Sequence, residues 1–534
     1  MQKSFERAIA NVVNHGDTDI FPFPIENRLA FDKKPELIAL LQAIHDDFDA
    51  AIVSRPPTNY GALAPVGYTG FRWATQIDPL WNLYFLSLVI EIGSKIEAVR
   101  LPPDRNTVFS YRFQDDDGPD LFSRSYGWRP FMEQATALAA NSGFVVSSDI
   151  SEFYPRLNHH RLDNALRQLP NADACRIRIM SFLSNFSETY SFGLPVGGPA
   201  ARLLSELTLN QVDRLLYQRQ VRFCRFADDY YLFAQTESEA FKALVLLSEI
   251  LHRNQGLQLQ KSKTRIMSSA EFARTNPLAR DEDPELSATP LAQSRSALLH
   301  LSLHFDPYST NAHEDYERLK TEIRKYPILE ILKSELGKSR INISLTRKLV
   351  STLQYIDQRD LDDAARTLVD NDELLYPVYF SVLSSLKTVF GKLGPAAQRY
   401  VVDKVRRTIE DGSPIMAVDL NLQYAVRLLS CLRTEESVSL FTMLYDERSS
   451  SALRRDIILA MARWKEWVWL SDRRAFFRSM SPMERRAYII GSFVLKDEGQ
   501  HWRSHTRSEF SDLELLTRDW AAERVNRENW EIPL

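Results

Sequence analysis

Two adjacent aspartates inside an apolar stretch constrain the fold of this chain more than any other feature. In VRFCRFADDYYLFAQ (221–235), residues that favour β-strands stand on both sides of Asp228 and Asp229. The pattern predicts a strand, a tight turn and a second strand, with both carboxylates at the turn. Neighbouring carboxylates in an apolar frame raise one another's pKa unless a cation is present, and a hard divalent ion with oxygen ligands relieves that repulsion. A solvated Asp-Asp turn explains the pair equally well when it is taken alone.

A third carboxylate follows a second predicted strand. In FVVSSDISEFYPRLNHHRL (144–162), a short apolar run ends at Asp149, and a helix is expected to start near Pro155 because proline suits the first helical turn. A strand end is a usual place for a catalytic carboxylate in an open sheet. Two strands would bring Asp149 beside Asp228, where the pair could hold two Mg²⁺ ions about 4 Å apart, an arrangement that serves transfer of a nucleotide. The alternative is that Asp149 caps a helix.

Two further segments carry weaker signals. The segment 191–216 opens with a Gly/Pro loop, where Gly197 permits close approach of the backbone to a ligand, and continues as a long amphipathic helix. The segment 256–267 predicts a strand and a turn with Lys263, which could offset the charge of a triphosphate. A plain connection and a solvated surface lysine are the respective alternatives.

The distribution of glycine divides the chain. A length of 534 residues predicts two or three domains. Twelve of the 18 glycines lie before residue 281, so the first part is expected to be mixed helix and sheet with many turns, and the second part nearly all helix. We therefore expect a domain over 1–280, a polar, proline-containing linker over 281–299, and an α-helical array over 300–534.

Charge and cysteine content exclude some classes of protein. The net charge of −4 argues mildly against a protein that wraps a long duplex, because phosphate contacts need Lys and Arg. The three cysteines are far apart and form neither a disulfide framework nor a zinc motif. The first residues lack the apolar run of a signal peptide, and no stretch approaches the ~20 apolar residues that span a bilayer. We expect a cytoplasmic protein that does not bind membranes.

Taken in order, the four segments resemble the palm of reverse transcriptases. The resemblance covers roughly residues 20–280, and GFRWATQIDPLWNLYFLSLV (70–89) and TVFSYRF (107–113) look like the fingers segments of bacterial members. The residues that carry it are Asp149 with Phe153 and Tyr154, the loop Leu194-Pro195-Val196-Gly197, the hairpin Phe226-Ala227-Asp228-Asp229, and Gly256-Leu257 with Lys263-Thr264.

Within that family the chain is most similar to the abortive-infection (Abi) polymerases. The similarity rests on FPFPIENR near the start, on the loop GLPVGGPAARLLSE and on the long helical C-terminal part. It implies phage defence, DNA synthesis without a template, priming from a protein tyrosine in some members, a HEAT-like helical repeat and homo-oligomers. Two departures from templated enzymes stand out: Val196 replaces the usual glutamine and cannot make its hydrogen bonds, and Phe226 replaces the more frequent tyrosine.

The resemblance also implies roles for individual residues. Asp149 and Asp228 would bind two Mg²⁺ ions, with Mn²⁺ as an alternative, the carbonyl of Ile150 would be an extra ligand, and Asp229 would support the catalytic site. Tyr154 would block a ribose 2′-hydroxyl, which predicts dNTPs as substrates and DNA, attached to the protein if a tyrosine primes, as product. The nucleotide site would be completed by Arg72, Gly197 and Lys263, although an ordinary strand-end arginine explains Arg72 equally well.

Two other functions remain open at this point. One is a conventional RNA-templated reverse transcriptase with a bound structured RNA. The other is a helical-array binding protein whose palm has lost activity, although the presence of all three aspartates is evidence against such decay.

Overall fold

The chain forms two compact units. The computed structural model describes residues 1–187, 190–275, 290–300, 319–527 and 531–534. Met1–Asn59 and Thr75–Arg280 form one unit, here called the sheet unit, and Tyr60–Ala74 and Asp281–Leu534 form the other, here called the helical unit. The sequence predicted a first domain that runs without a break over 1–280, whereas the contacts assign Tyr60–Ala74 to the helical unit.

A four-stranded antiparallel sheet organises the sheet unit. Its strands are β3 (Phe144–Asp149), β4 (Arg222–Phe226), β5 (Asp229–Ala234) and β6 (Arg265–Ser268), in the order β4-β5-β3-β6. Strands β4 and β5 form a hairpin with Ala227 and Asp228 at its tip. The strand that ends at Asp149 and the strand-turn-strand around the paired aspartates are thus present as the sequence predicts.

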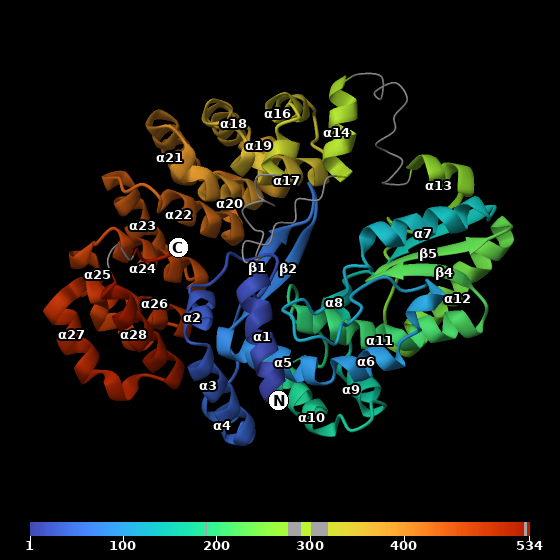
Figure 1. Ribbon diagram of the computed structural model, residues 1–534, viewed down its shortest axis with the longest axis horizontal. Helices are drawn as coiled ribbons and strands as arrows, with labels where there is room; N and C mark the ends of the chain where they lie inside the picture. The colour runs from blue at the N-terminus through green and yellow to red at the C-terminus, as the bar shows by residue number, and fades with distance from the viewer. Residues whose placement is uncertain (188–189, 276–289, 301–318, 528–530) are drawn as a thin grey trace. The chain divides into compact units, whose positions relative to one another are not determined.

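Helices cover both faces of this sheet (Figure 1). One face packs against α7 (Trp128–Ala140), where Phe131 and Met132 join Val145 and Phe233 of the strands in one apolar cluster. The other face packs against α11 (Pro199–Gln218) and α12 (Glu237–Gln255). Helix α11 begins directly after the Gly/Pro loop, as proline at the first helical position favours.

The sheet unit contains further helices besides α7, α11 and α12. They are α1 (Gln2–His15), α2 (Glu26–Asp32), α3 (Lys34–Asp46), α4 (Phe48–Ser54), α5 (Pro79–Glu91), α6 (Gly93–Val99), α8 (Phe153–Arg156), α9 (His159–Arg167), α10 (Asp173–Phe186) and α13 (Ser269–Thr275). Helix α5 packs against α1, α10 and α11 and is buried along nearly its whole length. This burial accounts for its continuous apolar sequence, since a helix that is apolar all round is a core helix in a protein of this kind.

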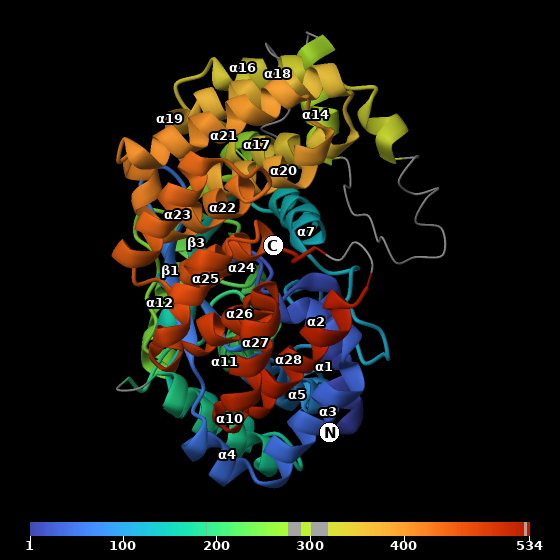
Figure 2. The same cartoon turned by 90° about the vertical axis from the view of Figure 1, so that its left-hand side faces the viewer.

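The helical unit is a succession of packed helices. They are α14 (Pro290–His300), α16 (Ile328–Leu336), α17 (Ile343–Thr352), α18 (Gln358–Asp370), α19 (Asp372–Leu375), α20 (Tyr379–Val389), α21 (Pro395–Glu410), α22 (Asp419–Leu429), α23 (Glu435–Glu447), α24 (Ser451–Arg463), α25 (Trp467–Arg473), α26 (Pro482–Gly491), α27 (Lys496–His505) and α28 (Asp512–Val525). Helices α17, α20, α22, α24, α26 and α28 each pack against the next one in this row (Figure 2). The C-terminal region is therefore largely helical, as its low glycine content predicts.

The expected linker is a helix over part of its length. Residues 281–289 lie outside the described residues, but Pro290–His300 form α14, which packs against α17. Pro290 stands at the start, where proline is tolerated, and Leu298 is fully buried. Arg295 of α14 also contacts Glu335 of α16 at 2.5 Å, so this part of the expected linker is joined to the helical unit by packing and by an ion pair.

The hairpin β1 (Asn59–Pro65) and β2 (Phe71–Ile77) is fastened to helices far along the chain. The hydroxyl of Tyr68 accepts a hydrogen bond from the amide of Ile341 and donates one to the carbonyl of Leu374, both at 3.0 Å. The hydroxyl of Tyr60 accepts one from Ser450 at 3.0 Å. These bonds explain why most of a hairpin that resembles a fingers segment belongs to the helical unit.

Among the described residues, the stretch Asp372–Lys392 is long and apolar enough to cross a membrane by length and composition. It contains α19 and α20, and half of its apolar window is buried inside the protein. Val382, Leu383 and Leu386 are fully buried, and α20 packs against α17 and α22. The stretch therefore has the character of a core helix of the helical unit.

Candidate active site

The three predicted carboxylates meet at one end of the sheet. Asp149 is the last residue of β3 and stands directly opposite Asp229, the first residue of β5. The amide of Ile150 donates a hydrogen bond to the carbonyl of Asp228 at 3.1 Å, which joins the hairpin tip to the end of β3. Register and turn thus place Asp149, Asp228 and Asp229 together although the two segments are distant in sequence.

The three carboxylates of this cluster repel one another. Burial raises the pKa of Asp229 to about 7, and the charges of Asp228 and Asp149 add to the shift. Lys263 is the counter-charge: its Nζ lies 2.5 Å from Oδ2 of Asp149. Burial opposes the charge of this lysine, but the bond to Asp149 outweighs it and raises the lysine pKa. Lys263 thus contacts Asp149, and its role toward a triphosphate stays a prediction.

The donor set fits a hard divalent cation by its chemistry. Three carboxylates against one lysine leave excess negative charge, and carboxylate oxygens are the ligands that Mg²⁺ prefers. The side chains do not form a complete set of metal ligands, however. In the parts of the chain that the structure describes, no group of three or more His, Cys, Asp and Glu side chains is arranged to hold a metal ion. One oxygen of Asp149 is instead engaged by Lys263.

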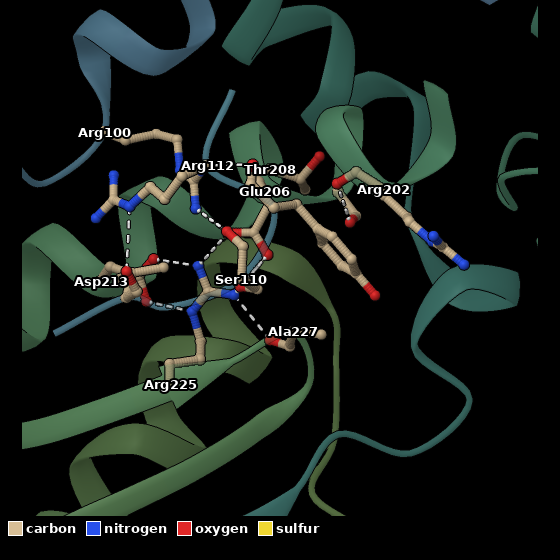
Figure 3. Close-up of polar contacts among 12 residues, drawn as sticks. Arg100, Ser110, Arg112, Arg202, Glu206, Thr208, Asp213, Arg225 and Ala227 are labelled. Carbon is tan, nitrogen blue, oxygen red and sulfur yellow. Dashed lines mark hydrogen bonds and ion pairs between the residues drawn. The ribbon is translucent and has the colours of Figure 1, made fainter. Parts of the chain in front are cut away.

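The turn that carries Asp228 has an unusual backbone. Ala227 has a φ of 53°, and the left-handed conformation costs a non-glycine residue about 1–2 kcal/mol. Its carbonyl accepts a hydrogen bond from Nη1 of Arg225 at 2.8 Å (Figure 3). A buried side chain therefore holds the tip of the hairpin in this conformation.

Arg225 belongs to a buried charge cluster with Glu206 and Asp213 of α11. Its guanidinium contacts Glu206 at 2.8 Å and Asp213 at 2.6 Å (Figure 3). Arg100 also contacts Glu206 at 2.6 Å, and the hydroxyl of Ser110 donates to the same carboxylate at 2.6 Å. Burial disfavours the charged form of Glu206, but Arg225 and Arg100 outweigh it and lower its pKa. The cluster thus holds opposite charges in a site without water access.

Sequence reasoning missed this cluster, although signals for it exist. Arg225 interrupts an otherwise apolar strand, and Glu206 and Asp213 stand seven residues apart, on one face of a largely apolar helix. Charged residues at positions where the pattern demands apolar ones are buried only when they are paired. That rule could have predicted a partner for each of them, but not which one.

Tyr154 lies beside the carboxylates, on α8. Its carbonyl accepts a hydrogen bond from the amide of Leu194 at 3.0 Å, so the Gly/Pro loop is held against this segment. Burial raises the pKa of its hydroxyl well above the ordinary value, and the nearby Tyr111 and the charge of Asp228 act in the same direction. Tyr154 is thus near enough to Asp228 for that charge to act on it, and its role in selecting the sugar stays a prediction.

Gly197 has a structural reason to be glycine. Its φ is 119°, and a Cβ atom there would lie 3.1 Å from Cβ of Thr18. The preceding residue, Val196, is buried, and its carbonyl accepts a bond from the amide of Thr75 at 3.3 Å. Close approach of the N-terminal segment thus accounts for this glycine, and a nucleotide contact is not needed to explain it.

Arg72 belongs to a different unit from the other predicted residues. It is exposed on β2, in the stretch that belongs to the helical unit, whereas the carboxylates, Tyr154 and Lys263 belong to the sheet unit. Its contact with a triphosphate stays a prediction.

Comparison with known proteins identifies the class of this domain. Residues 100–296 match the family "Reverse transcriptase (RNA-dependent DNA polymerase)". This range contains the sheet, the hairpin and the three carboxylates described above. The chain therefore contains a reverse-transcriptase domain, the domain of a polymerase that transfers nucleotides.

Similar solved structures include two telomerases. The structure of telomerase from Candida albicans in complex with a TWJ fragment of telomeric RNA is 10% identical, with a TM-score of 0.30 over 76% of this chain and 64% of that one. The apo telomerase of Candida tropicalis is 10% identical, with a TM-score of 0.29 over 69% of each chain. The chain thus spans less than two thirds of the Candida albicans protein, and likeness at this level carries no argument about function. No curated protein sequence matches the chain.

Proposed function

We propose that this protein is a DNA polymerase of the Abi type, which joins dNTPs without a template and acts in phage defence. The observation that carries the polymerase part is the register of the sheet, which sets Asp149 opposite Asp229 at the hairpin tip. Three carboxylates that meet inside a reverse-transcriptase domain are the donors that two-metal nucleotide transfer needs.

The residues of the site divide the chemical work. Asp149 and Asp228, with the carbonyl of Ile150, would hold two Mg²⁺ or Mn²⁺ ions, which activate a hydroxyl nucleophile and stabilise the leaving pyrophosphate. Lys263 brings a positive charge to the position where the triphosphate would gather negative charge. Tyr154 presents a bulky ring beside Asp228 and excludes a ribose 2′-hydroxyl by clash.

One observation supports synthesis without a template. Val196 is buried and apolar, and its side chain cannot hydrogen-bond as the glutamine of templated enzymes does. The rest of the proposal, namely priming from a tyrosine, a HEAT-like repeat, a homo-oligomer and a cytoplasmic location, follows from the resemblance to Abi polymerases.

The test is incorporation of each dNTP and each NTP by the pure full-length protein with Mg²⁺, with and without an added template. We expect dNTP incorporation in the absence of a template, DNA that is released from the protein only by protease, and acceptance of NTPs by Tyr154→Ala but not by Tyr154→Phe. A product that copies a co-purified RNA would instead support the RNA-templated alternative. Absence of any incorporation would support an inactive binding protein.

A further inference from the structure

The helical unit contains a pocket of about 780 Å³ that the polymerase chemistry does not use. One wall is formed by the hairpin β1–β2 and the others by α19, the start of α22 and the turn that precedes α22. The residues that line it are Gly61, Ala62, Leu63, Phe71, Trp73, Glu373, Tyr376, Ser413, Pro414, Ile415, Ala417, Val418 and Asp419. All of them belong to the helical unit, and the volume is typical of a site that binds a ligand larger than one side chain.

Aromatic rings form one side of the pocket. The indole of Trp73 lies against Gly61, since a Cβ atom at residue 61 would meet the ring at 2.4 Å. A glycine at this position lets the ring close on the strand while 56% of the side chain stays exposed. Phe71 is 49% exposed and meets the ring of Tyr376 edge-on, at 6.1 Å between ring centres. The rings of Trp73 and Phe71 therefore line the pocket with about half of their side-chain surface exposed, so core packing leaves aromatic surface open to a ligand.

Two carboxylates stand in the same lining. In the described part of the chain, the side chains of Glu373 and Asp419 make no hydrogen bond or ion pair, and no Lys or Arg lines the pocket. The charge of Arg448 acts on Asp419, but this arginine is not a lining residue. Unpaired carboxylates beside exposed aromatic rings are complementary to a cation, because both the charges and the ring faces attract it.

We propose that this pocket binds a peptide segment of a partner protein that presents an arginine or lysine beside apolar residues. The cationic head would lie between Trp73 and the carboxylates, and the apolar neighbours would cover Leu63 and Phe71. A nucleic acid fits less well, since its phosphates would meet two carboxylates and no cation in the lining. This site is independent of the carboxylates of the sheet unit, and its binding is separable from nucleotide incorporation.

The experiment is selection of binders from a random peptide library on the full-length protein, followed by titration of one selected peptide. We expect the selected peptides to carry Arg or Lys beside apolar residues. Trp73→Ala and the double variant Glu373→Gln/Asp419→Asn should each weaken binding at least tenfold. Trp467→Ala, which removes an exposed tryptophan of the helical unit outside the pocket, should leave it unchanged.

Three results would overturn the proposal. One is a library that yields no peptide able to distinguish the pocket variants from the wild type while their circular dichroism is unchanged. The second is a set of pocket-dependent peptides without Arg or Lys. The third is displacement of the peptide by oligothymidine at comparable concentration, which would mark the pocket as a site for nucleic acid.

Discussion

The two units each bury a cluster of opposite charges, and the clusters differ in what they touch. In the sheet unit, Arg225 lies between Glu206 and Asp213 and also donates to the carbonyl of Ala227 at the hairpin tip. In the helical unit, the carboxylate of Asp456 on α24 forms ion pairs with Arg427 of α22 at 2.6 Å and with the adjacent residue Arg455 at 2.8 Å. Both clusters are almost fully excluded from solvent.

This difference shows that a buried ion pair has to be judged by its position. Burial of charges costs about as much as their attraction returns, so such a cluster is weak evidence for stability on its own. The cluster in the helical unit joins two helices. The cluster in the sheet unit adds one bond to the turn that carries Asp228, so it can position the carboxylates of the candidate site.

The largest expected effect comes from removal of Arg225. Arg225→Met removes the ion pair of buried Asp213 and leaves Glu206 with Arg100 as its remaining cation, and it should lower the free energy of unfolding of the sheet unit by about 3–5 kcal/mol. Arg225→Lys keeps the charge but loses the planar fork that serves both carboxylates and the Ala227 carbonyl. Denaturant unfolding measures the first effect, and nucleotide incorporation measures the second.

The variant Arg225→Lys separates the effect of Arg225 on the position of the hairpin tip from its effect on the stability of the fold. We expect Arg225→Lys to be folded, to lose about tenfold or more in kcat, to need more Mg²⁺ and to keep its KM for dNTP. A folded Arg225→Lys protein with the Mg²⁺ dependence of the wild type would show that the bond to Ala227 has no part in positioning.

Removal of Arg427 should lower stability nearly as much as removal of Arg225 does, but it should leave nucleotide incorporation unchanged. Arg427→Met leaves Asp456 with the cation of Arg455 and a hydrogen bond from Gln423, and it should lower the free energy of unfolding of the helical unit by about 3 kcal/mol. Incorporation per folded molecule should not change, because the bonds of this cluster join α22 and α24 within the helical unit. A loss of activity in the folded variant would remove the contrast between the clusters.

The stabilisation by the buried charge cluster of the helical unit should also depend on pH. Burial opposes the charge of Asp456, but Arg427 and Arg455 outweigh it and lower its pKa from 3.8 to about 2. Because the folded pKa is below the unfolded one, the stabilisation is present above about pH 4 and is lost as the pH falls toward 2. The loss should be about 2 kcal/mol, measured as the unfolding free energy of the wild type at pH 5 and near pH 2. If Asp456→Asn shows the same acid loss as the wild type, another group is responsible.

The smallest expected effect concerns the strained turn. Ala227→Gly removes the cost of the left-handed conformation but adds backbone freedom worth about 0.5–1 kcal/mol, so the two changes nearly cancel. Unfolding of the sheet unit should shift by less than about 1 kcal/mol, and incorporation should persist because Arg225 still binds the carbonyl. A large loss of incorporation would mean that the alanine side chain itself is needed at the tip.

Local patterns predicted much of the sheet unit. The apolar run before Asp149 and the β-formers around the paired aspartates predicted β3 and the hairpin, and the match to the reverse-transcriptase family confirms the class of domain. The low glycine content of the second part predicted a largely helical region, which the structure confirms. The residues that the sequence grouped as a catalytic site keep that role as a prediction.

Contacts between distant segments were beyond the reach of the sequence. Glu206 and Arg225 pair across a helix and a strand, and no spacing rule connects them. The hydroxyl of Tyr68 fixes the hairpin to residues about 270 and 306 positions away, so a segment that resembles a fingers strand belongs to the helical unit. The glycine at position 197 was explained by a possible ligand, whereas the structure explains it by Thr18.

The most direct test of the central claim is a titration of Mn²⁺ by electron paramagnetic resonance, combined with dNTP incorporation. The wild type should bind Mn²⁺ saturably and incorporate dNTP. A folded variant in which Asp149, Asp228 and Asp229 are all alanine should lose both properties. The account would be contradicted if the triple variant bound Mn²⁺ as tightly as the wild type does and incorporated dNTP at the full rate.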